Sequence, residues 1–457
     1  MLVRKIYCNS TLKLNSIVSH DFFTLDLNLN DKMKKSNLIY LLIGTIFLGC
    51  QSGTSLNNSR LDINRLSLVD EMIEKAIEKN QIPGAVALIA KDNQILYKKA
   101  FGVKDPETGE KLQTNDIFRI ASMTKAITSL GIIMLWEKAL IYSLDDPIEW
   151  YIPEFKKLTV LDSFNEKDST YTSKPTSKKI TVRNLLTHTS GMGYDEIGSA
   201  EMRAIIFKEK QKFMKNSVIA FSVEDVTIAE TIKSIAKLPL EFEPGLRWNY
   251  SNSIDVLGYL IEIVSGKTLD QFFKDEIFTP LNMNDTYFYL PDEKKSRLVK
   301  VQTKKKEGWV SFSHNRYNVN YPIEGAKKFY SGGAGLSSTA EDYFKFLSVF
   351  LNDGSYNGKQ IIGKMTNKLL QSDQMANITS NRHKGGHGLI STVIRDEDLY
   401  KGNLGSAGTL HGGGYFNTKY FADPNEKVIG ILLKQTRDIS EYTSNKFIRL
   451  VFSSIIK

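Results

Sequence analysis

A serine and a lysine stand three residues apart at the start of an apolar stretch, as Ser122 and Lys125 in "ASMTKAIT". Positions i and i+3 share one face of a helix, so the lysine amine can reach the serine oxygen. A serine hydroxyl becomes a nucleophile when a neighbouring base takes its proton. The S-x-x-K spacing also starts at Ser10, Ser234 and Ser454, and the spacing alone therefore selects none of them.

Two further groups along the chain can complete such a site. Tyr250-Ser251-Asn252 places a phenol two residues before a side-chain amide. His411-Gly412-Gly413 combines an ionisable ring with glycines, which let the edge of a strand come close to a ligand. Each group is a weak signal alone, because Y-x-N also occurs at Tyr7 and Tyr415.

The elements that position these residues follow from the hydrophobic periodicity. Residues 66–81 have helical spacing, and residues 84–103 predict two strands around a turn at Asp92-Asn93. Residues 122–140 are apolar on nearly all sides, which predicts a buried helix that begins at Ser122. The nucleophile candidate would therefore sit at a helix N-terminus, where the helix dipole favours negative charge.

The C-terminal part of the chain supplies the same kinds of element. Residues 337–354 predict a capped amphipathic helix, residues 408–435 two strands joined through "DPNE", and residues 439–456 a closing helix. Because both ends of the body combine helices with strands, we expect them to form one layered unit.

Composition is that of an ordinary globular protein. The 457 residues are 41% hydrophobic and 24% charged, which is enough to bury a sizeable core. We expect an α+β domain over residues 66–457, with an antiparallel sheet flanked by helices. Its α+β lobe would come from about 66–121 and 300–457, and a mainly helical lobe of about 140–300 would be inserted between them.

Charge and cysteine content narrow the function classes. The net charge is +9, but the basic residues are scattered, which indicates solvated faces and no nucleic-acid surface. The two cysteines, Cys8 and Cys50, lie before the body, which leaves no disulfide framework or cysteine metal site within it. His383 and His387 are close in "HKGGH", but the glycines favour a loop. We expect no metal and no cofactor.

Taken together, S-x-x-K at Ser122, Y-x-N at Tyr250 and H-x-G at His411 resemble the serine β-lactamase and penicillin-binding-protein superfamily, in its class C-like or esterase type. The likeness continues in order through "IPGAVALIAKDNQILYKKAFGV", "ITVRNLLTHTSGM", "FEPGLRWNYSNSIDVLGYLIE" and "SGGAGLSSTAEDYFKFL", and it covers roughly residues 66–435. The resemblance implies the β-lactamase/transpeptidase-like fold and a serine hydrolase that forms an acyl-enzyme on Ser122.

The same resemblance assigns roles to the other residues. Lys125 and Tyr250 would be the two bases, and Asn252 would hold Lys125 and the substrate by hydrogen bonds. The backbone N–H groups of Ser122 and Gly414 would form the oxyanion hole.

The third motif bears on the substrate class. His411 and Gly413 would line the substrate from the strand edge. Many members that bind β-lactams carry a lysine where this chain has His411, as a fixed cation for the substrate carboxylate, whereas an unperturbed histidine is mostly neutral at pH 7. No equivalent of the class A deacylating glutamate is evident. We therefore expect an esterase or a D-amino-acid peptidase or amidase, with a true β-lactamase or D-Ala-D-Ala carboxypeptidase as the alternative.

Two alternative functions and one further candidate residue, His188, also have support in the sequence. "HGGG" at 411–414 matches the oxyanion motif of some α/β-hydrolase lipases, but the chain has no G-x-S-x-G. A non-catalytic cell-wall sensor or binding lipoprotein would use the same fold, and the intact Ser122, Lys125 and Tyr250 argue against it. His188 in "HTSGM" lies in a segment that the family places around the site, and we expect it to be structural.

The N-terminal segment predicts the cellular location of the protein. From Met33, two lysines precede a short apolar run that ends in Leu48-Gly49-Cys50, and residues 33–50 resemble a bacterial lipoprotein signal. This implies a lipidated Cys50 at the mature N-terminus, followed by a polar tether over residues 51–65. Residues 1–32 fit no such scheme and are interpreted as an extension that is not translated. We expect an exported, lipid-anchored monomer that acts on a small-molecule ester, peptide or amide.

Overall fold

The computed structural model describes residues 60–194, 197–213, 220–314, 318–375, 378, 385–437 and 439–456. The predicted signal with Cys50 lies outside the described residues. The body begins earlier than the predicted tether allows, because Arg60–Leu61 already forms strand β1 and helix α2 begins at Ile63. The Asp62 side chain caps that helix by accepting the N–H of Asn64, a start signal that the apolar periodicity alone did not reveal.

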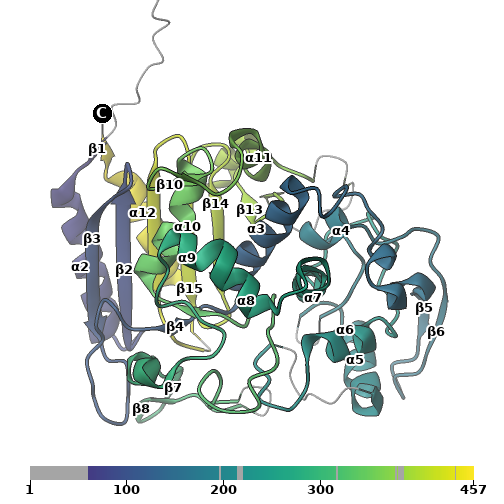
Figure 1. Cartoon of the computed structure of the whole chain (residues 1–457). Helices are drawn as coiled ribbons and strands as arrows, with labels where there is room; N and C mark the ends of the chain where they lie inside the picture. The colour runs from purple at the N-terminus through teal and green to yellow at the C-terminus, as the bar shows by residue number, and fades with distance from the viewer. Residues whose placement is uncertain are drawn as a thin grey trace, which may run out of the picture. The chain divides into compact units, whose positions relative to one another are not determined.

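A seven-stranded antiparallel sheet is the centre of the fold (Figure 1). Its strands are, in spatial order, β12 (Gly386–His387), β13 (Thr392–Val393), β14 (Leu410–Gly414), β15 (Thr418–Asp423), β16 (Val428–Leu433), β2 (Gly84–Lys91) and β3 (Gln94–Gly102). β2 and β3 are joined at the predicted Asp92-Asn93 turn, where both residues have positive φ. β2 pairs with β16, so the two ends of the body meet in the middle of the sheet.

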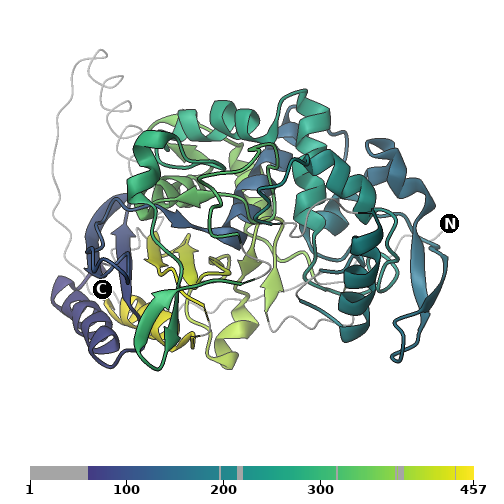
Figure 2. The same cartoon turned by 90° about the horizontal axis from the view of Figure 1, so that it is seen from below.

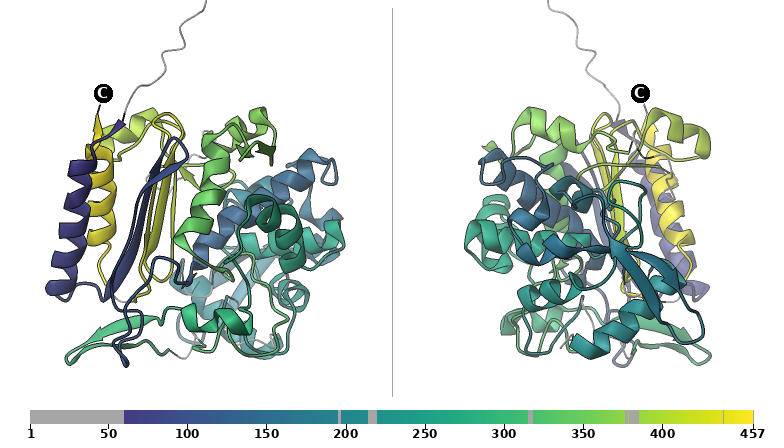
Figure 3. Two further views of the ribbon diagram at one scale, coloured as in Figure 1. Left: turned by 60° about the vertical axis from the view of Figure 1, so that its left-hand side comes forward. Right: turned by 90° about the vertical axis from the view of Figure 1, so that its right-hand side faces the viewer.

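Helices cover both faces of the sheet. α2 (Ile63–Glu78) and α12 (Tyr442–Ser453) lie side by side on one face (Figure 3). α3 (Thr124–Glu137) and α10 (Ala340–Leu351) share the larger apolar core on the other face. Within β2 the side chains alternate, since Val86 and Leu88 join the larger core while Ala87 joins the smaller one. The predicted α+β class, an antiparallel sheet flanked by helices, is confirmed.

A mainly helical part lies beyond α3, and its β5–β6 hairpin is at the opposite end of the body from α2 (Figures 1 and 2). α7 (Ser253–Ser265) packs against α3, and a side chain at Gly131 of α3 would come within 2.9 Å of Ile261. The other elements of this part are β5 (Thr159–Phe164), β6 (Tyr171–Pro175), α4 (Val182–Leu186), α5 (Ala200–Phe213), α6 (Ile228–Ile235), α8 (Leu269–Phe273) and α9 (Thr279–Leu281).

The remaining elements are short. They are β4 (Phe118–Arg119) with β9 (Ser337–Ser338), β7 (Gln302–Lys305) with β8 (Gly308–Ser311), β10 (Ser355–Tyr356) with β11 (Lys359–Gln360), α11 (Lys364–Leu370), and β17 (Ile455–Ile456), which pairs with β1. None of the helices in the described ranges is both long and apolar enough to cross a membrane.

The prediction of two strands over residues 408–435 is wrong, because the structure has three. A tight turn at Tyr415–Asn417 separates β14 from β15; Asn417 has a φ of +64°, and its N–H donates to the carbonyl of Gly414 at 3.0 Å. Asparagine tolerates this left-handed conformation better than most residues, so it was the overlooked turn signal. The result is that "HGGG" forms a strand of its own.

Lys434, directly after β16, is a buried lysine whose ammonium has no hydrogen-bond partner among the described residues. Burial lowers its pKa to about 8, partly opposed by the charge of Glu441. Between that value and about 10.4, the pKa of an exposed lysine, the unfolded chain binds more protons than the folded one, so stability rises with pH in this window. Below pH 8 the Lys434 amine is protonated in both the folded and the unfolded chain, so the full free-energy cost of burying its charge remains.

We therefore expect Lys434→Met to stabilise the fold at pH 7, by up to about 3 kcal/mol, and to remove most of the rise in stability between pH 8 and 10. The measurement is urea unfolding at several pH values. Lys111→Met, at an exposed position, serves as the control and should leave the pH dependence unchanged. Equal slopes in Lys434→Met and the unchanged chain would show that Lys434 is not the group that titrates.

Candidate active site

Ser122 lies in a one-turn 3-10 helix, Ala121–Met123, directly before α3. Ala121 has a φ of +45°, a left-handed conformation that costs an alanine about 1–2 kcal/mol and that the surroundings must enforce. One such contact is the Tyr343 hydroxyl, which donates to the Met123 carbonyl at 3.0 Å. The strained turn leaves Ser122 partly exposed at the N-terminal end of α3, where negative charge is stabilised.

Tyr250 stands opposite the serine. Its hydroxyl donates a hydrogen bond to the Ser122 Oγ at 2.8 Å. The contact exists because α7, which begins at Ser253, packs against α3 and so brings the preceding residues to the start of that helix. At this distance a proton can pass between the two oxygens.

Lys125 is buried one helical turn beyond the serine. Its Nζ donates to the carbonyl of Gly333 at 2.7 Å, and it lies 4.8 Å from the ring centre of Tyr250 and 5.7 Å from that of Tyr194. An ammonium over the face of an aromatic ring is attracted to it, and the attraction grows if the ring gains negative charge. Lys125 is thus placed to stabilise the phenolate form of Tyr250, which is the form that can accept the serine proton.

The loop that holds Lys125 is itself anchored by α7. Asp255 accepts hydrogen bonds from the Ser331 hydroxyl at 2.6 Å and from the Gly333 N–H at 2.9 Å. A side chain at Gly333 would begin 2.3 Å from the Asp255 carboxylate, so glycine is required there. This buried aspartate was missed from the sequence, because nothing in its spacing links it to a glycine loop that lies far along the chain.

The edge of the sheet forms the third side of the site. His411, Gly412 and Gly413 of β14 line the same pocket as Ser122. Gly414 does not line it but lies against the nucleophile turn, since a Cβ there would come within 2.3 Å of the Ile120 carbonyl oxygen. The contact places β14 beside Ser122, and the role of the Ser122 and Gly414 N–H groups as oxyanion donors stays a prediction.

These residues line a pocket of about 160 Å³ that is open to solvent. Tyr420 lies beneath β14 and also lines it; burial raises the pKa of Tyr420 to about 12, so it remains a neutral hydroxyl. The lining residues are Ser122, Lys125, Ala126, Ser129, Leu186, His188, Tyr250, Ile254, His387, Ile390, Ser391, Thr392, His411, Gly412, Gly413 and Tyr420.

The "HTS" segment supports the tyrosine from the side. The ring of His188 lies 4.7 Å from that of Tyr250, and its Nδ1 accepts the N–H of Ser251 at 3.3 Å. Ser190 is fully buried and shares a hydrogen bond of 2.7 Å with the Ser253 hydroxyl. Ser190 is therefore closed to a substrate, whereas Ser122 is open to the pocket.

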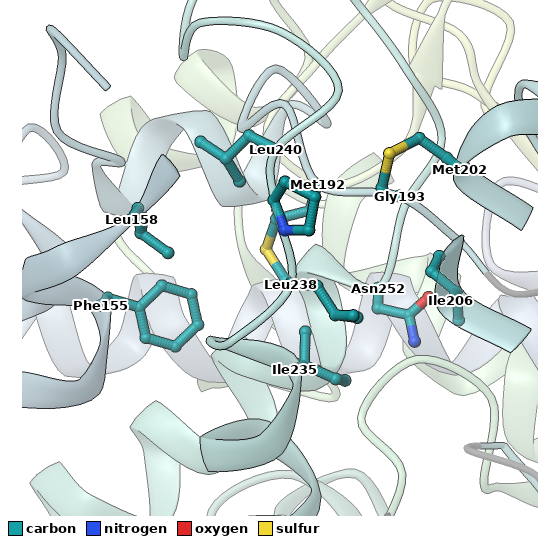
Figure 4. A pocket seen from close by; sticks show the side chains of 11 residues that line it. Phe155, Leu158, Met192, Gly193, Met202, Ile206, Ile235, Leu238, Leu240 and Asn252 are labelled. Atoms are coloured by element: carbon teal, nitrogen blue, oxygen red, sulfur yellow. The ribbon is translucent and has the colours of Figure 1, made fainter. Parts of the chain in front are cut away.

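Asn252 lies elsewhere. It lines a separate space in the helical part (Figure 4), and the Lys125 ammonium donates to the Gly333 carbonyl. Of the predicted site residues, the structure thus brings Ser122, Lys125, Tyr250, His411 and Gly413 to one pocket, whereas Asn252 lines another space.

Across the described ranges, no three His, Cys, Asp or Glu side chains gather as a metal site would require. His383 of "HKGGH" lies outside those ranges, and His387 belongs to the wall of the pocket.

Comparison with known proteins agrees with this geometry. The family model described as "Beta-lactamase" matches residues 69–450. Esterase EstB of Burkholderia gladioli is 27% identical over 407 residues, which cover 84% of this chain and 95% of that protein. The lovastatin esterase of Penicillium rubens is 28% identical, covering 79% of this chain and 91% of its own length. Among solved structures, "EstCE1, a hydrolase with promiscuous acyltransferase activity" superposes with a TM-score of 0.72 at 23% identity and covers 86% of this chain and 100% of its own.

Proposed function

The chain belongs to the beta-lactamase family, and from this membership and the geometry of the pocket we propose that it is a serine esterase that works through an acyl-enzyme on Ser122. The observation that carries the proposal is the 2.8 Å hydrogen bond between Tyr250 and Ser122, with the Lys125 ammonium 4.8 Å from the tyrosine ring. Two relatives named as esterases, matched over most of their length, favour esters over other acyl compounds.

The reaction proceeds in two acyl transfers. In the first, the phenolate form of Tyr250 takes the proton of Ser122 while Oγ forms a bond to the ester carbonyl carbon, and Tyr250 then passes that proton to the departing alcohol as the bond between that alcohol and the carbonyl carbon breaks. In the second, Tyr250 takes a proton from water, the water oxygen bonds to the carbonyl carbon, and Ser122 leaves with the proton. Lys125 stabilises the negative charge that Tyr250 carries after the alcohol has taken the proton and before water supplies the next one.

The proposal predicts an order among substrates. p-Nitrophenyl esters of short acids should be hydrolysed with a kcat/KM at least about a hundredfold above those of nitrocefin and of a peptide ending in D-Ala-D-Ala, because His411 lines the pocket at the motif position where the resemblance to β-lactam-binding members implies a lysine for the substrate carboxylate. Steady-state kinetics on this panel provide the measurement. A preference for nitrocefin would make the chain a β-lactamase, and preference for the D-Ala peptide would make it a carboxypeptidase.

The control for this ordering is His411→Lys, which supplies the cation. It should lower the ratio of kcat/KM for the esters to kcat/KM for nitrocefin, because a carboxylate beside the scissile bond can then pair with the lysine ammonium. A panel in which no compound is hydrolysed by the unchanged chain would favour the non-catalytic sensor.

We further propose that the protein is exported and anchored in a bacterial membrane through a lipid on Cys50. The support is the sequence alone, in the Lys34-Lys35 pair, the short apolar run and Leu48-Gly49-Cys50. A lipoprotein carries more than one acyl chain on its cysteine, and two or more such signals give stable membrane attachment.

Replacing the acceptor of the lipid tests this directly. In a bacterial host, Cys50→Ala should leave the protein unprocessed or release it from the membrane fraction. The measurement is fractionation combined with intact mass, and Ser55→Ala, in the predicted tether, is the matched control, which should remain processed and anchored. An intact segment 1–49 in the mass spectrum of the mature protein would contradict the proposal.

A further inference from the structure

Residues 331–333 lie between α3 and α7, and side chains of α3 hold them by hydrogen bonds. The Thr128 hydroxyl donates to the Gly332 carbonyl at 2.7 Å, and the Lys125 ammonium donates to the Gly333 carbonyl at 2.7 Å. The segment also packs closely on α7, because a Cβ at Gly332 would come within 2.8 Å of a backbone carbonyl oxygen of that helix. The place of the Gly333 carbonyl therefore decides where the Lys125 ammonium lies.

Asp255 holds the same segment from the α7 side through a single oxygen atom. Its Oδ1 accepts both the Ser331 hydroxyl, at 2.6 Å, and the Gly333 N–H, at 2.9 Å. The Ser331 hydroxyl in turn accepts the N–H of Ala334 at 3.1 Å, which closes the turn around the glycines. Asp255 is buried, and hydrogen bonds to a charged acceptor are stronger than those between neutral groups. The Gly333 peptide is thus fixed from both helices.

Asp255 and Tyr250 belong to the same short stretch of chain. Tyr250 comes just before α7, and Asp255 is in the first turn of that helix, where the helix dipole favours a carboxylate. The start of α7 therefore places the tyrosine directly and the Lys125 ammonium indirectly, through Gly333. The ammonium lies 4.8 Å from the centre of the Tyr250 ring, and this separation decides how strongly the phenolate is stabilised.

We propose that Asp255 is a positioning residue for the reaction, which holds the Lys125 ammonium beside Tyr250 by fixing the Gly333 peptide. The inference rests on the proposed esterase function. A lysine ammonium is a point charge on a flexible four-carbon stem, so it moves when the carbonyl that accepts its hydrogen bond moves. Asp255 does not line the pocket that receives the substrate. Loss of its hydrogen bonds should therefore lower kcat and leave KM nearly unchanged.

Two substitutions at Asp255 separate its hydrogen bonds from its charge. Asp255→Ala removes the accepting oxygen and should lower kcat for p-nitrophenyl acetate about a hundredfold, the usual effect of a catalytic group displaced by about 1 Å. Asp255→Asn keeps an oxygen that can accept both hydrogen bonds, so its kcat should fall less than about threefold. Steady-state kinetics give kcat and KM for each variant. Equal losses in the two variants would overturn the proposal, because the hydrogen bonds would then not be what matters.

A double-mutant cycle with Lys125→Met tests whether Asp255 acts through the ammonium. In the Lys125→Met background the benefit of positioning is already lost, so Asp255→Ala should lower the remaining kcat less than about threefold. A merely structural role would multiply the two losses, and a further fall toward the rate of Ser122→Ala would contradict the proposal. If Lys125→Met alone is as slow as Ser122→Ala, the comparison of Asp255→Asn with Asp255→Ala decides the question.

The matched control is Asp342→Ala, which removes another buried carboxylate that holds a loop. Asp342 accepts the Asp285 N–H at 2.7 Å and the Thr286 hydroxyl at 3.0 Å. Its loss should lower the melting temperature but change kcat less than about threefold. A hundredfold loss of kcat in Asp342→Ala as well would mean that lost stability, and not positioning, explains the effect.

Melting temperatures identify any variant that fails to fold. If Asp255→Ala does not fold, Ser331→Ala takes its place; it removes one of the two hydrogen bonds and should lower kcat about tenfold. An unchanged kcat in the folded variant would overturn the positioning role, while continued ester hydrolysis would leave the esterase function standing. If the unchanged protein hydrolyses no ester at all, the esterase function itself is wrong.

Discussion

Ser122→Ala should lower kcat for the best ester by about 10⁴-fold or more and leave the melting temperature nearly unchanged. Removal of the nucleophile alone eliminates the covalent route, and the residual rate then comes from binding and oxyanion contacts. Only one hydroxyl is lost, from a partly exposed position at the start of α3, so the packing of that helix is untouched. Steady-state kinetics and thermal unfolding measure the two effects.

Labelling separates loss of chemistry from loss of binding. A fluorophosphonate should modify the unchanged chain at a peptide containing Ser122 and should not modify Ser122→Ala. Ser391→Ala is the matched control, because Ser391 is another serine on the wall of the same pocket. Labelling that persists in Ser122→Ala, or that disappears only in Ser391→Ala, would assign the nucleophile to another residue.

Tyr250→Phe should lower kcat by about 10²–10⁴-fold, the usual contribution of a general base. The substitution removes the hydroxyl that contacts Ser122 and keeps the ring that packs against His188 and Tyr194. Because the base acts in both acyl transfers, formation and breakdown of the acyl-enzyme should slow together. Stopped-flow release of p-nitrophenol and mass spectrometry of the quenched enzyme measure the two steps.

Tyr194→Phe provides the comparison for that result. Its ring lies at a similar distance from Lys125, 5.7 Å against 4.8 Å for Tyr250, but the recorded hydrogen bond to Ser122 comes from Tyr250. It should therefore cost much less activity than Tyr250→Phe. Equal losses in the two variants would mean that removing either hydroxyl near Lys125 disturbs the site alike, and the loss in Tyr250→Phe could then not be assigned to proton transfer by Tyr250.

The grouping of Ser122, Lys125 and Tyr250 could be predicted because each lies in a short motif and the three motifs occur in a fixed order. The α+β class was predictable for a similar reason, since hydrophobic periodicity reports burial of each segment on one or both faces. In β2 the unbroken apolar run corresponds to a strand covered by helices on both sides.

What escaped prediction depends on contacts between distant segments. The left-handed backbone of Ala121 is imposed by neighbours, and alanine gives no local sign of it. Asp255 and Gly333 meet only after α7 has packed, and the direction of the Asn252 side chain is decided by the same packing. The start of the body at Arg60 depends on the pairing of β1 with β17, which a pattern of apolar residues cannot report.

The pairing of β2 with β16 imposes an order on biosynthesis. Leu88 has its partner in Ile431, so 431 − 88 = 343 positions separate the two strands along the chain. A ribosome has made Ser122, Lys125 and Tyr250 long before it makes the strand that completes the sheet beneath them. A nascent polypeptide therefore carries all three reacting groups before it can fold into an active enzyme. A premature stop before β16 would yield a chain that keeps every catalytic side chain but cannot complete the sheet that holds them in place.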